Sequence, residues 1–106
     1  MDIGSVVYSK AGRDKGGYYI VVRLSETAGF VFIADGETRR IEKPKLKKIR
    51  HLRDSGVVIE KLANKFTAQK LVHNAEVRSA LKAYNGIDAA AEPPDGEERP
   101  EGRETS

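Results

Sequence analysis

Short β-prone runs separated by glycine-containing turns dominate the first half of the chain. Val, Ile and Tyr are concentrated in residues 5–9 and 18–24, and a glycine-rich segment, residues 10–17, lies between these runs. β-branched and aromatic residues favour half-buried strands, and glycine supplies the backbone angles that a sharp reversal needs. We therefore expect two strands joined by a tight turn.

The same pattern continues downstream. Residues 30–34 read FVFIA, a third strand, and Asp35-Gly36 is a hairpin signal that predicts a return strand over residues 38–41. Pro44 interrupts the pairing, and residues 46–52 add either a last short strand or a helical turn. Short strands at this spacing favour a small barrel, which removes its open edges by closing. We predict a mainly β fold with a small barrel over residues 1–53.

After Asp54-Ser55-Gly56 the apolar residues adopt helical spacing. The first helical face would hold Ile59, Leu62, Ala63 and Phe66, although β-branched residues 57–59 leave an extended conformation open. The second would hold Val77, Ala80, Leu81 and Tyr84. Asn74 is a candidate N-cap, Arg78 and Lys82 point away from the apolar face, and Asn85-Gly86 is a stop signal. We expect residues 54–88 to form one or two helices packed on the barrel.

Residues 89–106 carry two Lys or Arg against six Asp or Glu and no apolar residue larger than alanine. Such a segment buries too little surface to offset its ordering entropy, so we expect a disordered acidic tail.

The segment from residue 39 to residue 53, RRIEKPKLKKIRHLR, concentrates positive charge. It contains eight Lys or Arg, one Glu and one His. Four apolar residues are spaced through it, namely Ile41, Leu46, Ile49 and Leu52. We expect these four to hold the segment against a core so that its cations face outward. An ordered row of cations suits phosphate recognition.

Charge is unevenly distributed along the chain. Residues 1–53 carry twelve Lys or Arg against six Asp or Glu, a net +6, whereas the whole chain carries +3. A basic half points to a nucleic acid or an anionic membrane. No strongly amphipathic basic helix is available for a membrane surface, so RNA is the favoured partner and we expect no membrane association.

Catalytic and metal sites are not expected. There is no cysteine, and His51 and His73 have no carboxylates nearby at ligand spacing. The segment from Gly12 to Gly17 lacks the Gly-Lys-Ser/Thr ending of a phosphate-binding loop. We therefore expect no enzyme activity, metal, cofactor or small-molecule substrate. Without an apolar membrane span or a signal peptide, the chain is expected to be cytoplasmic.

The residues around the first turn resemble a known motif. GSVVYSK (residues 4–10), then AGRDKG (residues 11–16) and an apolar strand, resemble the KOW motif, a strand–loop–strand unit of ribosomal proteins and transcription elongation factors. IADG (residues 33–36), followed by Thr38-Arg39-Arg40 and the basic run, resembles the "fourteen-e" type of large-subunit ribosomal protein and its short bacterial relatives. LVHNAEVRSAL (residues 71–81) is similar to the last helix of those bacterial relatives.

The resemblance implies an SH3-like barrel that binds RNA, most plausibly ribosomal RNA of the large subunit, with a role in translation. Together with the basic run, it gives the residues expected to contact RNA: Lys10, Gly12, Arg13, Lys15, Gly16, Arg39, Arg40, Lys43, Lys45, Lys47, Lys48, Arg50, His51 and Arg53. The acidic tail departs from the basic extensions of ribosomal proteins, which leaves open a transient ribosome-associated role.

Two alternatives accompany this interpretation. The barrel could instead dock on a ribosomal protein or an RNA polymerase as a protein-interaction module. Tyr18 or Tyr19, beside the turn, could stack on bases, but packing between strands and helix is the favoured role for both.

Overall fold

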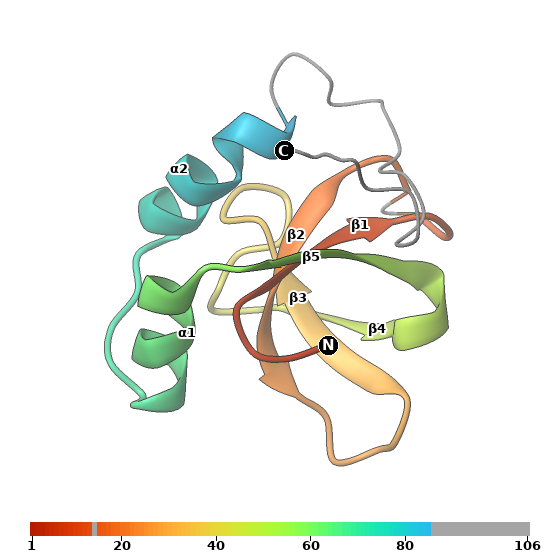
Figure 1. Cartoon of the computed structure of the whole chain (residues 1–106), viewed down its shortest axis with the longest axis horizontal. Coiled ribbons are helices and arrows are strands. Elements are labelled where there is room, and N and C mark those ends of the chain that lie inside the picture. Colours follow the sequence, from red (N-terminus) through yellow and green to blue (C-terminus); the bar gives the residue numbers. More distant parts are fainter. Residues whose placement is uncertain (14, 86–106) are drawn as a thin grey trace.

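A five-stranded antiparallel sheet with two helices forms the fold. The computed structural model describes residues 1–13 and 15–85. The strands are β1 (Ser5–Ser9), β2 (Tyr18–Leu24), β3 (Phe30–Ala34), β4 (Lys45–Lys48) and β5 (Leu52–Val58), in the order β4-β3-β2-β1-β5. A 3-10 turn, η1 (Ile49–His51), joins β4 to β5, and the helices α1 (Glu60–Thr67) and α2 (Asn74–Asn85) lie on one side of the sheet (Figure 1). Asp14 and the expected acidic tail lie outside the described residues.

The first three strands have the bounds that the sequence predicts. Their alternating apolar residues are buried on both faces of the sheet, which explains why neither face of β2 is polar before Arg23. The predicted mainly β domain with helices after the strands is confirmed.

The expected return strand over residues 38–41 is wrong. These residues form turns and bends. The Asp35 carboxylate accepts hydrogen bonds from the backbone N–H groups of Glu37 (2.9 Å) and Arg39 (2.8 Å). Local side-chain bonds of this kind offer the backbone an alternative to a strand ladder. Asp35 therefore stabilises its own turn through local hydrogen bonds.

The segment 46–52 contains both of the structures that its sequence left open, a strand and a helical turn. β4 ends at Lys48, η1 turns the chain, and β5 begins at Leu52 and runs past the expected boundary at residue 53. The β1–β5 register shifts between the pairs Ser5–Val58 and Val7–Asp54, so extra β5 residues form a bulge. The turn-like residues after Arg53 therefore bend the last strand without ending it. The extended alternative for residues 57 and 58 is confirmed, and α1 begins at Glu60.

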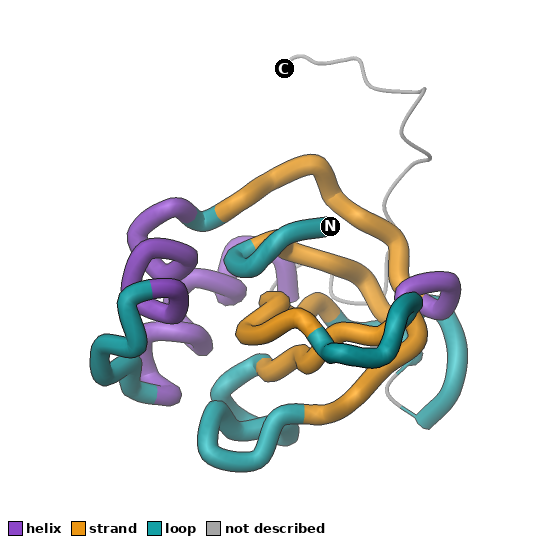
Figure 2. The backbone as a smooth tube through the Cα atoms, turned by 90° about the horizontal axis from the view of Figure 1, so that it is seen from below, coloured by secondary structure: helices purple, strands orange, loops and turns teal. Residues whose placement is uncertain are grey.

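Two apolar cores lie on the two faces of the sheet. The helix-side core contains Val6, Tyr8, Tyr18, Ile20, Val22, Ala34, Leu62, Val72, Val77 and Leu81. The second core contains Val7, Tyr19, Val21, Val31, Ile33 and Leu52. In this second core Leu52 of β5 clusters with Ile33 of β3, although these strands are not neighbours in the sheet. The sheet is therefore strongly curved around the second core (Figure 2).

Side-chain hydrogen bonds fasten α2 to the sheet at both ends. The amide of Asn85 accepts from the Tyr18 N–H (2.8 Å) and donates to the Tyr18 carbonyl (3.1 Å). The amide of Asn74 accepts from the Ile41 N–H (2.8 Å). Between them, Arg78, which is exposed as expected, also donates to the Gly36 carbonyl (2.9 Å).

The expected N-cap role of Asn74 is also wrong. Its side chain reaches residues 41 and 42, and the carboxylate of Glu76 accepts from the His73 N–H (3.0 Å) at the start of the helix. Lys65 of α1 donates to the same carboxylate at 2.8 Å, and these two bonds lower the pKa of Glu76. The ion pair thereby links the two helices.

Candidate nucleic-acid interface

The KOW-like turn and the end of the basic run lie against each other. The Lys10 N–H donates to the His51 carbonyl at 3.0 Å. The Lys47 ammonium lies so close to Gly12 that a Cβ there would be 2.8 Å from Nζ. Two segments that are separate in sequence therefore form one surface, which we call the turn patch. It consists of Lys10, Gly12, Lys47, Lys48, Arg50 and His51.

Within the turn patch, Lys47 has a different role from its neighbours. Its side chain is 6% exposed, and it lies opposite Val31 in the β3–β4 ladder, on the face of the second core. Lys10, Lys48 and Arg50 are exposed. No ion pair engages these three side chains within residues 1–13 and 15–85. Their charges are therefore available to an anion, whereas Lys47 packs the turn against β4.

The pKa of His51 is affected by its position in the turn patch. Partial desolvation, and then the charges of Arg50, Lys48, Lys47 and Lys10, hold the pKa of His51 below its ordinary value. A nearby phosphate would oppose the cations and favour the protonated ring. An anion bound at the turn patch would therefore raise the pKa of His51 toward its ordinary value.

A second group of cations, the loop patch, consists of Arg39, Arg40, Lys43 and Lys45. They line a hollow of about 400 Å³ together with Thr38, Pro44 and Leu46. Here a carboxylate intervenes, because Glu42 Oε1 lies 3.6 Å from Arg40 Nε. The Asn74 amide donates to both Glu42 oxygens (3.0 and 2.9 Å) and, ahead of the charge of Arg40, lowers the pKa of Glu42. The loop patch is thus partly neutralised.

The remaining predicted contact residues are spread around these two patches. Arg13 and Lys15 are exposed on either side of Asp14, and Gly16 closes the turn through a backbone bond to the Ser9 carbonyl (2.8 Å). Arg53 is half-buried in β5 opposite Tyr8. Of the four apolar residues expected to anchor the run, Ile41, Ile49 and Leu52 contact a core, but Leu46 is 44% exposed.

The tyrosines beside the turn pack inside the protein. Tyr18 and Tyr19 are 8% and 6% exposed, and the Tyr18 ring lies 5.2 Å from that of Tyr8 and 5.4 Å from that of Tyr84. Packing between strands and helix is confirmed for Tyr18, whereas Tyr19 packs in the second core, on the other face of the sheet. The aromatic residue near exposed cations is instead Phe30, which pairs with Lys48 across β3 and β4. The alternation in FVFIA is the signal that sets Phe30 apart from buried Val31 and Ile33.

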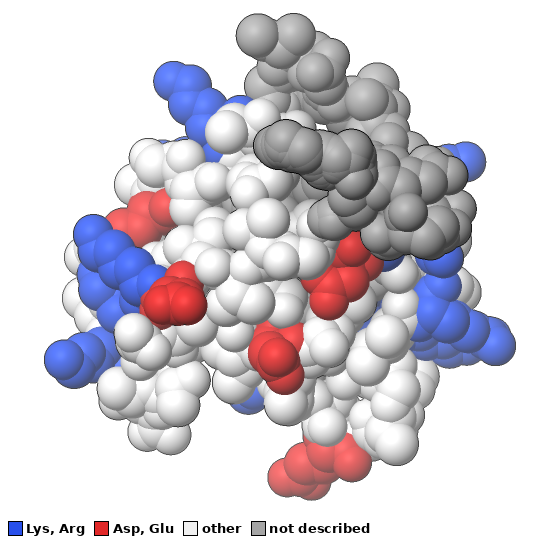
Figure 3. Space-filling view, in the orientation of Figure 1, with Lys and Arg blue, Asp and Glu red and all other residues white. Residues whose placement is uncertain are grey.

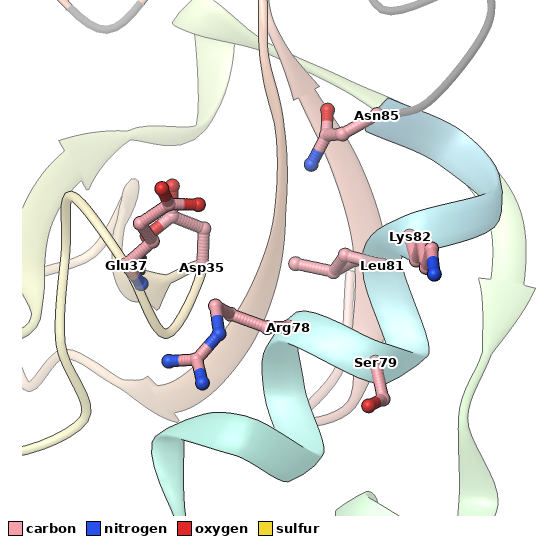
Figure 4. Close-up of a pocket in the computed structure, with 7 residues that line it drawn as sticks. All are labelled: Asp35, Glu37, Arg78, Ser79, Leu81, Lys82 and Asn85. Atoms are coloured by element: carbon pink, nitrogen blue, oxygen red, sulfur yellow. Dashed lines mark hydrogen bonds between the residues drawn. The ribbon is translucent and has the colours of Figure 1, made fainter.

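Outside the two patches, positive and negative side chains are mixed on the surface. The face in Figure 3 is mostly uncharged at its centre, and Lys and Arg gather at its margins, including the corner where β4 leads into β5. A smaller hollow of about 360 Å³ lies between α2 and the turn after β3, with Arg78 and Lys82 on the helix and Asp35 and Glu37 on the turn (Figure 4). Its opposite charges suit no single class of ion.

Among the described residues, no three His, Asp or Glu side chains gather as a metal site. In the same part of the chain, neither helix has the length and apolar character needed to cross a bilayer. Comparison of the sequence with models of known protein families and with curated protein sequences gave no match.

Proposed function

We propose that this protein is a non-catalytic RNA-binding module of the KOW type, whose curved sheet is an SH3-like barrel and whose target is structured RNA, ribosomal RNA in the first place. The observation that supports it most is the joining of the KOW-like turn to residues 47–51 in one cationic surface. Exchange of condensed counterions for these cations drives affinity for the phosphate backbone.

The two patches have different roles in this proposal. Lys10, Lys48 and Arg50 contact phosphates from an ordered corner of the sheet. Because the backbone that carries them is already ordered, binding costs little backbone entropy. Arg39 and Arg40 extend the contact along β4, and their planar groups bind phosphate oxygens in pairs. Glu42 weakens the field at Arg40, which makes the turn patch the principal site.

Salt dependence tests the proposal directly. If about five phosphates are contacted, a plot of log affinity against log salt should have a slope of about −3.5 to −4.5. The measurement is fluorescence anisotropy with a labelled ribosomal RNA hairpin between low and moderate salt. Affinity that does not change with salt would contradict the proposal.

Binding should also strengthen as pH falls. The pKa of His51 is lowered in the free protein, and bound phosphate raises it, so the complex holds more protons than the free components. Affinity should therefore rise as pH falls from 8 to 6, by at most about tenfold per pH unit for one proton. His51→Ala should remove this dependence, and His73→Ala, at the start of α2, should retain it. Equal pH profiles for the two variants would refute the role of His51.

One observation favours a second candidate, a protein-interaction module that docks on a ribosomal protein or RNA polymerase. Leu71, before α2, is 76% exposed. RNA that co-purifies with the protein and is released by high salt would distinguish the first candidate from this one.

A further inference from the structure

A shallow apolar hollow opens beside the turn patch, where β3 begins and η1 turns. Its volume is about 600 Å³, and its lining is largely apolar. The residues that line it are Gly29, Phe30, Lys48, Ile49 and Arg50. Two of them, Lys48 and Arg50, are the exposed cations described above, so the hollow and the phosphate-binding surface are continuous.

Local structure holds this hollow open. Phe30 is paired with Lys48 in the β3–β4 ladder, and the Ile49 N–H donates to the Gly29 carbonyl at 2.8 Å, which ties η1 to the turn before β3. Gly29 has no side chain to fill the space. The Phe30 side chain is half-buried and is not part of either core cluster, so part of it borders the hollow.

We propose that this hollow binds an unpaired nucleobase of the RNA, stacked on Phe30, with the adjoining phosphates on Lys48 and Arg50; this inference rests on the proposed function. Aromatic side chains stack on bases that are free of a helix. The hollow is large enough for one base, since ligand pockets of about 300–1,000 Å³ hold whole small molecules. The bases of a paired stem are stacked inside the helix, so a stem can contact this surface only through its phosphates.

The chemistry of the lining also predicts how selective the hollow is. The described residues that form it contribute no carboxylate or amide side chain to read base edges. Lys48 and Arg50, which could contact a guanine edge, are engaged by the phosphates in this arrangement. Recognition through a ring face tolerates any base. The hollow therefore distinguishes a loop or bulge from a paired stem, but it does not distinguish one base from another.

The test compares two RNAs of equal length, a hairpin with 2-aminopurine at an unpaired position and a fully paired duplex. Phe30→Leu should weaken hairpin binding at least about fivefold, the lower end of the loss for one base–aromatic stack. It should leave duplex binding and the salt slope unchanged. Fluorescence quenching of the hairpin should also be lost, because no ring remains to stack.

Phe32→Leu is the matched control. Phe32 is two residues away in β3, packs against the helix-side core and lies under Arg23, whose Cζ is 4.2 Å from the ring centroid. This variant should keep the hairpin preference, as should Phe30→Tyr, which retains a ring. Thermal melting identifies any variant that fails to fold.

Two results separate this inference from the proposed function. If Phe30→Leu keeps the wild-type hairpin preference while binding remains salt-dependent, the stacking inference is overturned and RNA binding stands. If the wild-type protein binds neither RNA, both are overturned.

Discussion

Replacing Lys10, Lys48 and Arg50 together with alanine is expected to abolish most of the affinity for structured RNA. Each lost phosphate contact removes about 0.7–0.9 from the salt slope, so the slope should fall by about 2–3. If the triple variant and the wild-type protein bind equally at 1 M salt, this difference in slope makes the affinity of the variant at 0.1 M salt about 100- to 500-fold lower than that of the wild type. Anisotropy titrations at several salt concentrations measure both quantities.

Lysines on and between the two helices provide a control of equal charge. Lys61, Lys70 and Lys82 are exposed and lie outside both patches, so their joint replacement by alanine changes the net charge identically. If net charge alone attracted RNA, both triple variants would lose affinity equally. That result would contradict a localised interface.

Gly36→Ala is expected to destabilise the fold by about 2–5 kcal/mol, from about 1–2 kcal/mol for a left-handed backbone and about 1–3 kcal/mol for overpacking. Gly36 has φ +80°, and a Cβ there would collide with the Asn74 carbonyl and lie 3.1 Å from Arg78 Cγ. The alanine must push α2 away from the turn after β3. Urea denaturation followed by circular dichroism measures the loss.

Gly29→Ala separates the two causes. Gly29 has φ +87°, and no atom of the described residues other than its own and its chain neighbours' lies within 4 Å of the Cβ position. This variant should therefore show only the backbone cost of about 1–2 kcal/mol. Equal destabilisation of the two variants would mean that contact with α2 contributes nothing.

Sequence patterns predicted those parts of the fold that local preferences decide. The bounds of β1, β2 and β3 follow from short apolar runs between glycines, and the apolar face of α2 follows from its spacing. β5 escaped prediction because Asp54-Ser55-Gly56 is typical of a turn. Its strand character depends on pairing with β1, to which the bulge adapts it, and pairing between distant segments leaves no local signal.

The candidate site was predicted in composition but not in arrangement. Charge alone made Lys47 and Lys48 equivalent, and only strand alternation in the folded sheet buries the first and exposes the second. Likewise, both tyrosines beside the turn are buried, as expected, but the sequence did not indicate that Phe30 lies opposite the cation Lys48. The long-range contacts of the Asn74 and Asn85 amides could not be predicted from local sequence, because their partners are 33 and 67 residues away.

The bonds between Asn85 and Tyr18 bear on the order in which the chain folds. Every strand residue in the described part of the chain has been synthesised once residue 58 is complete, but the β3 ladder pairs only as far as Ala34 with Ile20. The N–H and carbonyl groups of Tyr18, which lies beyond the last β2–β3 pair, form hydrogen bonds with the side-chain amide of Asn85 instead. During synthesis, the Tyr18 peptide groups would thus lack these partners until the last turn of α2 is complete, and a chain that ends at residue 84 would contain β1 to β5 but lack both bonds.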